Sequence, residues 1–320
     1  MRLIMMGTGP FAVPTFRGLF QTHHTVVALV TGPIKRRGKR VIAVSPMRDV
    51  AHEHGVEIFD PSGINTAESM AALRQYEADL HIVCDYGQIL STECLATARL
   101  GGINLHASLL PKYRGAAPIN WAIYDGEEET GVSVIHMTPK IDAGPVIAQG
   151  RTPIEPDETA DSLEDRLADI GSWMIRRSID SLESGNLEAL PQDPALASKA
   201  PRLKKTDGEI DWRRSAEAIR NQVRAFHPWP KTYTFWLRSQ GSPLRLIVGP
   251  IRVLDHSPCS ETPGTVLEAT EDQFVIATGE GRAALTTLQP AGKRAMPVRE
   301  FLLGYRVTPG DHFGSEPQTS

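Results

Sequence analysis

The chain has 320 residues and a formal net charge of -4, and 41% of its residues are hydrophobic. This length supplies enough apolar residues for two domain cores, and the negative charge argues against a general polyanion binder. No apolar run reaches the ~20 residues that a membrane span requires, and the start MRLIMMGTGP meets a turn too early for a secretory signal, so we expect a cytoplasmic protein with no membrane partner.

The first part of the chain alternates short apolar runs with helically periodic stretches, a pattern typical of a parallel sheet covered by helices. Strands are predicted at 2–6, 25–30, 56–59, 78–84, 102–105 and 131–137, and helices at 11–19, 47–54, 67–76 and 159–182. The predicted fold is therefore an α/β domain with a Rossmann-like, mostly parallel sheet. Such folds bind their ligands at the carboxyl ends of the strands.

The second part of the chain follows a segment, 185–201, that carries three prolines and no sustained period, which favours a linker. Beyond it, short apolar runs at 233–237, 244–253, 264–269, 273–278 and 283–288 are separated by Gly, Pro and Ser turns. This spacing predicts a small β barrel. The predicted domains are a catalytic domain at 1–184, a linker at 185–205, a barrel at 206–310 and a tail at 311–320.

The cysteines Cys84, Cys94 and Cys259 have neither a pairing pattern nor the close spacing of a zinc site. We expect buried, reduced thiols, and neither a disulfide nor a metal.

Basic residues gather in one loop near the start, since the first 48 residues contain no Asp or Glu. Five of them lie between the second predicted strand and the second predicted helix, at Lys35, Arg36, Arg37, Lys39 and Arg40. We predict a local anion site there, with a solvated loop as the alternative. From residue 200 onward the chain is also mildly basic, with 16 basic and 13 acidic residues.

A glycine motif, Gly7-Thr8-Gly9 followed by Ala12, formally fits the dinucleotide fingerprint. That interpretation requires an acidic residue about 20 positions later, and none occurs before Asp49. A tight turn is the favoured interpretation. An NADP oxidoreductase, with the basic loop on the 2′-phosphate, stays as an alternative.

Three polar residues carry the strongest chemical signal. Asn104 and His106 stand two apart at the end of a predicted strand, so their side chains leave on the same face, and Asp142 lies in a turn after the strand at 131–137. Each alone is commonly structural. Together they can bind an oxyanion, move a proton and orient the imidazole, so we predict that all three are catalytic.

The motifs around these residues resemble the folate-dependent formyltransferase family. The run from Asn104 to Pro111 and the Asp142-Ala143-Gly144 turn match the whole group, including its glycinamide ribonucleotide and sugar-nucleotide enzymes. The segments 226–230 and 288–293 resemble the members that act on methionyl-tRNA. The resemblance spans nearly the whole chain. It implies a monomer with an OB-like barrel that transfers the formyl group of 10-formyltetrahydrofolate to initiator methionyl-tRNA.

The resemblance also implies site residues. The folate contacts would be Ser108, Leu109, Leu110 and Pro111, together with the pteridine-pocket loop Tyr86, Gly87, Gln88, Ile89 and Leu90. Transfer RNA contacts would be the basic loop, with Arg37 at the acceptor stem, and Lys204, Lys205 and Lys293. Asn104 would stabilise the oxyanion, His106 would transfer the proton, and Asp142 would orient His106.

Two segments depart from the family pattern. Gly9-Pro10 replaces a common Pro-Asp, and Thr31-Gly32-Pro33 replaces a Gln-Pro-Asp start to the basic loop, which leaves the shapes of both turns open.

Trp229, between two prolines, is expected in the core. The alternatives within reach of these motifs are a formyltransferase for a sugar nucleotide and a catalytically silent RNA-binding protein.

Overall fold

The structure is a computed structural model that describes residues 1–37, 40–271 and 273–316, with 35–37 and 40–43 described by their backbone alone. The chain divides into two compact units, each built from several segments. The first contains Met1–Pro118, Glu129–Pro153 and Ser162–Pro201, and the second contains Ile119–Glu128, Ile154–Asp161 and Arg202–Ser320. Among the described residues, no helix has the length and apolarity needed to cross a membrane.

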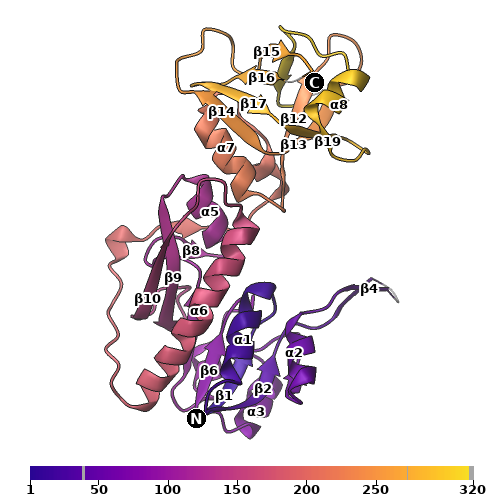
Figure 1. The fold of residues 1–320 in the computed structure, drawn as a ribbon. Helices are drawn as coiled ribbons and strands as arrows, with labels where there is room; N and C mark the ends of the chain where they lie inside the picture. The colour runs from indigo at the N-terminus through magenta and orange to yellow at the C-terminus, as the bar shows by residue number, and fades with distance from the viewer. Residues whose placement is uncertain (38–39, 272, 317–320) are drawn as a thin grey trace. The chain divides into compact units, whose positions relative to one another are not determined.

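The first unit contains a seven-stranded sheet in the order β10-β9-β7-β6-β1-β2-β5 (Figure 1). Its parallel strands are β1 (Arg2–Met6), β2 (Thr25–Val30), β5 (Glu57–Phe59), β6 (Leu80–Val83) and β7 (Gly102–His106). Strands β9 (Glu129–His136) and β10 (Val146–Pro153) extend it antiparallel. The predicted Rossmann-like sheet is confirmed. Strand β10 was not predicted, because its sequence VIAQGRTP mixes Gln, Gly and Arg into a weak pattern.

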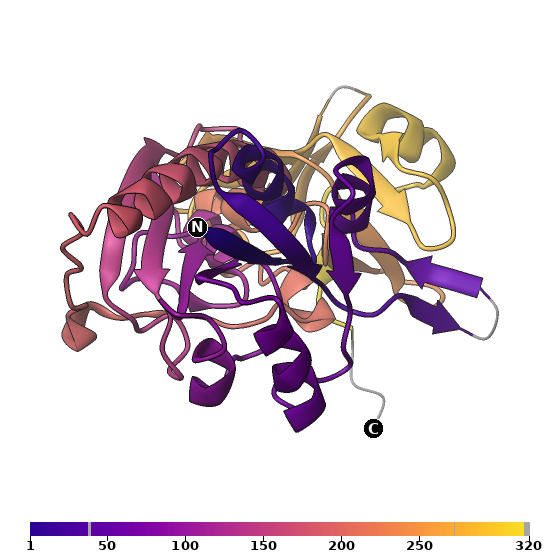
Figure 2. The same ribbon diagram turned by 90° about the horizontal axis from the view of Figure 1, so that it is seen from below.

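Helices cover both faces of this sheet. A short 3-10 turn, η1 (Pro10–Ala12), leads into α1 (Val13–Leu19), which lies with the long α6 (Ala160–Glu183) on one face, while α3 (Ala67–Gln75) and α4 (Thr92–Leu95) cover the other (Figures 1 and 2). Ile4 and Met6 of β1 are fully buried with Leu73 of α3 and Cys94 of α4. α1 and α6 are joined where Ser172 Oγ donates to the Pro14 carbonyl at 2.8 Å.

The basic segment is a hairpin rather than the predicted loop. Strands β3 (Lys35–Arg37) and β4 (Arg40–Ala43) pair antiparallel and are followed by α2 (Met47–Glu53). The run Val41-Ile42-Ala43 supplies the β propensity that the cluster of charges hid.

The segment predicted as a linker takes part in the first unit. It contains a 3-10 turn, η2 (Pro194–Leu196), and a short strand, β11 (Lys199–Ala200), which pairs in parallel with β8 (Arg114–Gly115). Backbone pairing of two residues leaves no periodic signal, which is why the sequence pattern indicated only a connection.

The second unit is built mainly from two antiparallel sheets, β19-β18-β13-β12-β20 and β14-β17-β16-β15. The strands are β12 (Thr232–Leu237), β13 (Leu244–Val248), β14 (Ile251–Asp255), β15 (Val266–Ala269), β16 (Phe274–Ala277), β17 (Arg282–Leu285), β18 (Thr287–Pro290), β19 (Met296–Pro297) and β20 (His312–Gly314). The apolar run at 244–253 forms two strands that are separated at Gly249-Pro250, because proline has no N–H to donate to a neighbouring strand.

Four helical segments complete the second unit: α5 (Pro118–Tyr124), η3 (Lys205–Gly208), α7 (Ala216–Ala225) and α8 (Val298–Gly304). Its apolar core contains Phe274, Phe301 and Phe313, each with no exposed surface. The prediction that a second domain of short strands follows the α/β domain is confirmed, and these strands are antiparallel.

Two predictions about single residues fail. Trp229 is 50% exposed, so the flanking prolines hold it at the surface instead of in the core. Cys84 and Cys94 are buried, but Cys259 is only half-buried, because it lies in an exposed turn after β14.

Candidate active site

Two predicted catalytic residues lie at the carboxyl end of β7. This strand pairs in parallel with β6 and antiparallel with β9, so its end meets the turn that follows β6 at one edge of the sheet. Asn104 is partly exposed, and within the described part of the chain its amide has no hydrogen-bond partner. His106 is 6% exposed. The amide of Asn104 is therefore free to donate to a ligand.

The hydrogen bonds of His106 define the roles of its two nitrogens. Nε2 lies 2.9 Å from the Tyr113 carbonyl oxygen, which can only accept, so Nε2 carries the proton of this bond. Nδ1 lies 3.6 Å from Asp142 Oδ2, a separation beyond a direct hydrogen bond. Nδ1 is consequently the nitrogen available to exchange a proton, and it faces the Asp142 carboxylate.

Asp142 is held in place by backbone contacts. Its φ is +49°, a left-handed conformation that Asp tolerates better than most residues, and its Oδ2 accepts a hydrogen bond from the Gly115 N–H at 2.9 Å. The structure thus brings together the three residues that the sequence predicted as catalytic, from β7 and from the turn between β9 and β10.

Gly115, the donor to Asp142, sits where only glycine fits. Its φ is +130°, and a Cβ there would lie 2.4 Å from the Ala200 carbonyl oxygen. This close approach is the β8–β11 pairing, reinforced by a hydrogen bond of 2.8 Å from Ala116 N–H to the same carbonyl. The segment predicted as a linker therefore fixes the residue that orients Asp142.

Gln192 is a positioning residue that the sequence analysis missed. Its amide nitrogen donates to the carbonyls of Asp142 and Gly144, at 2.8 Å each, and its amide oxygen accepts from the guanidinium of Arg114. The Gln192 side chain thus connects the Asp142 turn to Arg114 of β8, the residue next to Gly115. A lone glutamine in an aperiodic, proline-containing segment gave no signal that could have identified it.

The predicted folate-contacting run, 108–111, is a buttressed loop. Ser108 is fully buried and its hydroxyl donates to the Lys112 carbonyl at 2.7 Å, so its side chain supports the loop in this structure. Gln149 donates to the Leu110 carbonyl at 2.7 Å. Leu110 is 4% exposed, whereas Leu109 and Pro111 are partly exposed and remain available for contact.

The predicted pteridine-pocket loop, 86–90, follows β6 and combines buried and exposed positions. Tyr86 and Leu90 are buried in the core, and burial raises the pKa of the Tyr86 hydroxyl. Gln88 accepts a hydrogen bond from the Ile64 N–H. Gly87 and Ile89 are exposed, the latter by 58%, and offer backbone and apolar surface.

Asp85 precedes this loop and accounts for one departure from the family pattern. A Cβ on Gly9 would lie 1.6 Å from Asp85 Oδ2, so the carboxylate takes the space that any side chain at position 9 would occupy. Asp85 keeps exposed surface as a residue, but partial burial removes water from its carboxyl and raises the pKa to about 6. The sequence analysis did not single out this residue.

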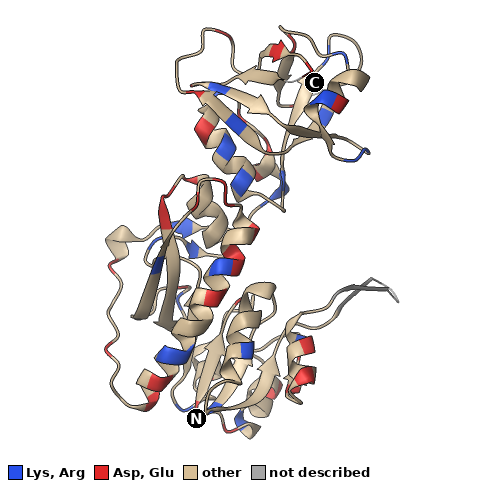
Figure 3. Cartoon of the chain, viewed as in Figure 1, with Lys and Arg blue, Asp and Glu red and all other residues tan. Residues whose placement is uncertain are grey.

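The predicted transfer RNA contacts fall into two groups. Lys39 lies outside the described residues, and the side chains of Lys35, Arg36, Arg37 and Arg40 are not among those described. Lys204, Lys205 and Lys293 are exposed in the second unit. Basic residues there are interspersed with acidic ones, as Figure 3 shows along α7.

Comparisons with known proteins define the class. The family model described as "Formyl transferase" matches residues 1–179, and the model described as "Formyl transferase, C-terminal domain" matches residues 202–306. Fold and site therefore define a formyltransferase. A methionyl-tRNA formyltransferase of Rhodopirellula baltica is 43% identical, covering 97% of this chain and 96% of the relative. One of Halalkalibacterium halodurans is 41% identical and covers 95% of each chain. The chain belongs to the methionyl-tRNA formyltransferase family.

Solved structures share the fold at low identity. The sugar 3N-formyl transferase WlaRD, crystallised with dTDP and 5-N-formyl-THF, aligns with a TM-score of 0.62 at 18% identity over 92% of this chain and 99% of that one. HypX from Aquifex aeolicus, in complex with tetrahydrofolic acid, aligns with a TM-score of 0.59 at 17% identity over 94% of this chain and 46% of that one. The likeness to these structures concerns architecture.

Proposed function

We propose that this protein transfers the formyl group of 10-formyltetrahydrofolate to the α-amino group of initiator methionyl-tRNA. The observation that carries the proposal is the meeting of Asn104, His106 and Asp142 at the carboxyl edge of the sheet, in a chain that both formyltransferase family models match. The relatives at about 40% identity, named methionyl-tRNA formyltransferases, support the acceptor.

The reaction needs a neutral amine, a stabilised oxyanion and one proton transfer. An α-amino group has a pKa of about 7.7–8.0, and the ester of an aminoacyl-tRNA lowers it, so much of the nucleophile is already neutral. Attack forms the bond between this nitrogen and the formyl carbon, and the carbonyl oxygen becomes an oxyanion. The free amide of Asn104 is placed to donate to that oxygen.

His106, assisted by Asp142, then transfers the proton. The attacking nitrogen loses a proton to His106 Nδ1, and the Asp142 carboxylate, 3.6 Å away, stabilises the imidazolium. The same proton passes to N10 of the folate as the bond from N10 to the formyl carbon breaks. The products are formylmethionyl-tRNA and tetrahydrofolate, and no metal is required at these three residues.

The proposal also covers the substrate contacts, the domain division and the oligomeric state. We place folate against Ser108, Leu109, Leu110, Pro111 and the 86–90 loop, and transfer RNA against the β3–β4 hairpin, Lys204, Lys205 and Lys293. The division into a catalytic domain at 1–184, a linker at 185–205, a transfer RNA-binding barrel at 206–310 and a tail at 311–320 is retained, with a monomeric, cytoplasmic protein. Analytical ultracentrifugation of the full chain measures the oligomeric state.

The test is a comparison of acceptors. Labelled 10-formyltetrahydrofolate is incubated with the protein and, in parallel, initiator methionyl-tRNA, elongator methionyl-tRNA and a dTDP-linked amino sugar. We expect formylation of the initiator alone. Formylation of only the amino sugar would retain the chemistry and refute the acceptor, and no transfer to any of the three would refute both.

A further inference from the structure

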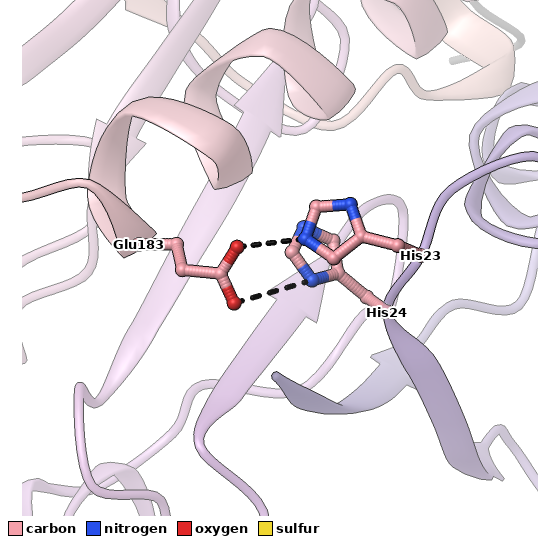
Figure 4. Close-up of side chains that lie close together, drawn as sticks. All are labelled: His23, His24 and Glu183. Carbon is pink, nitrogen blue, oxygen red and sulfur yellow. Dashed lines mark hydrogen bonds and ion pairs between the residues drawn. The ribbon is translucent and has the colours of Figure 1, made fainter.

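Three side chains with metal-binding atoms meet away from the catalytic residues. His23 and His24 directly precede β2, and Glu183 is the last residue of α6. One ligand atom from each lies within 4.8 Å of the others, and Figure 4 shows the Glu183 carboxylate facing both imidazoles. In the part of the chain that the structure describes, no other three His, Cys, Asp or Glu residues come together in this way.

The separations suit a small transition-metal ion. His23 Nε2 lies 2.7 Å from Glu183 Oε2, and His24 Nδ1 lies 3.8 Å from Glu183 Oε1. Ligand atoms at about 2.0–2.1 Å from a tetrahedral ion lie about 3.3 Å from one another, and the three candidate ligand atoms here already lie within 4.8 Å of one another. The His23 side chain is 66% exposed, so it can rotate onto an ion arriving from solvent, whereas the His24 side chain has no exposed surface.

The buried imidazole has the outer partner that a metal-bound histidine requires. His24 Nε2 lies 3.3 Å from Asp180 Oδ1, three residues before Glu183 on the same face of α6. An imidazole that donates a hydrogen bond from Nε2–H to a carboxylate has an unprotonated Nδ1. In His24, Nδ1 is the nitrogen that faces Glu183. Carboxylate partners of this kind orient histidine ligands and raise their basicity.

The surrounding charge also favours a cation. Asp180 and Glu183 lie in the last turn of a 24-residue helix, whose carboxyl end is the negative end of its dipole. The α-amino group of Met1 already occupies this field, 3.1 Å from His24 Nδ1 and 3.2 Å from Glu183 Oε1. The alternative arrangement is therefore a metal-free network centred on this ammonium, and a metal ion must displace it or take the deprotonated amine as a further ligand.

We propose that His23, His24 and Glu183 bind one divalent transition-metal ion and that Asp180 positions His24. Two imidazoles and one carboxylate suit Zn²⁺ and its neighbours, whereas Mg²⁺ and Ca²⁺ prefer oxygen ligands. The site lies before the amino end of β2, while Asn104 and His106 lie at the carboxyl end of the parallel strand β7, so the two sites are at opposite ends of the parallel strands. The ion ties the loop before β2 to the end of α6 and takes no part in formyl transfer.

Zinc titration of the full chain tests this proposal. The protein is produced without a histidine tag, stripped with EDTA, and titrated with ZnCl₂ by isothermal titration calorimetry. We expect one zinc ion per chain and a higher Tm with zinc. His23→Ala and Glu183→Gln, both at exposed positions, should each weaken binding at least about tenfold, and Asp180→Asn by about 10- to 100-fold.

His52→Ala is the matched control, because His52 is an exposed histidine on α2 outside this group. It should bind zinc as the wild type does, and circular dichroism melts check that every variant is folded. Wild-type binding no tighter than that of the His23→Ala/Glu183→Gln double variant would overturn the proposal and leave the ammonium-centred network as the role of these residues.

Discussion

The two compact units concentrate different kinds of side chain. In the first unit, polar side chains gather at the carboxyl end of β7, where the Asn104 amide has no hydrogen-bond partner among the described residues and His106 faces Asp142. In the second unit, the residues that converge are aromatic: the ring of Phe274 lies 6.3 Å from that of Phe301 and 5.6 Å from that of Phe313. Substitutions at the carboxyl end of β7 should therefore affect catalysis with little effect on folding, whereas substitutions in the aromatic cluster should affect folding with little effect on catalysis.

In the first unit, the largest expected effect is a loss of formyl-transfer rate. Asn104→Ala and His106→Ala should each lower the single-turnover rate of formyl transfer by about 10²- to 10³-fold, since each removes a group that acts on the transition state. Thermal melting should show both variants folded. A variant that is stable and retains more than a tenth of the wild-type rate would remove that residue from the mechanism.

In the second unit, the largest expected effect is a loss of folding stability. Phe274 has no exposed surface, so Phe274→Ala should lower the free energy of unfolding by about 3–5 kcal/mol. Folate binding should persist below the transition, because the predicted folate contacts lie in the first unit. Denaturant unfolding and fluorescence titration with folate measure the two quantities, and parallel loss of both would show that the units are not separable in this way.

A smaller effect is expected where chemistry depends on positioning. Gln192→Ala removes the two hydrogen bonds to the Asp142 turn and should lower kcat about tenfold while KM for folate stays close to the wild-type value. Glu188→Ala, an exposed change in the same segment, is the matched control. If both variants have wild-type kcat, the segment 185–201 serves only as a connection.

Acceptor binding should respond to charge rather than to shape. The double variant Lys204→Gln/Lys205→Gln should raise KM for methionyl-tRNA several-fold and reduce the salt dependence of binding by about one to two phosphate contacts. Arg252→Gln, an exposed basic position on β14, provides the control. Equal effects of the two changes would point to general electrostatics instead of a defined contact.

The smallest effect concerns pH. The pKa of Asp85 is about 6 in the folded chain and 3.8 ordinarily, so the folded state holds the proton more tightly and loses stability as pH rises from about 4 to 6. Asp85→Asn should match the wild type near pH 4 and exceed its stability above pH 6, by about 1 kcal/mol or less because the exposed carboxylate is screened. A wild-type advantage at pH 7 would contradict this.

The sequence predicted the sheet, most of its helices and the common face of Asn104 and His106 because their signals are local. Period and composition mark strands such as 25–30, and spacing alone places Asn104 and His106 on one face. Gln192 and the β8–β11 pair could not be predicted, since they act through contacts between residues 48 to 85 positions apart. Asp85 was missed for a similar reason: its importance depends on the missing side chain at Gly9.

The most direct test of the account is detection of formylmethionine by mass spectrometry after initiator methionyl-tRNA is incubated with 10-formyltetrahydrofolate and either the wild type or the folded Asn104→Ala/His106→Ala double variant. We expect formylmethionine with the wild type, and formation of formylmethionine by the double variant at no more than about one hundredth of the wild-type rate. Comparable product from both would contradict the claim that these residues carry out the transfer.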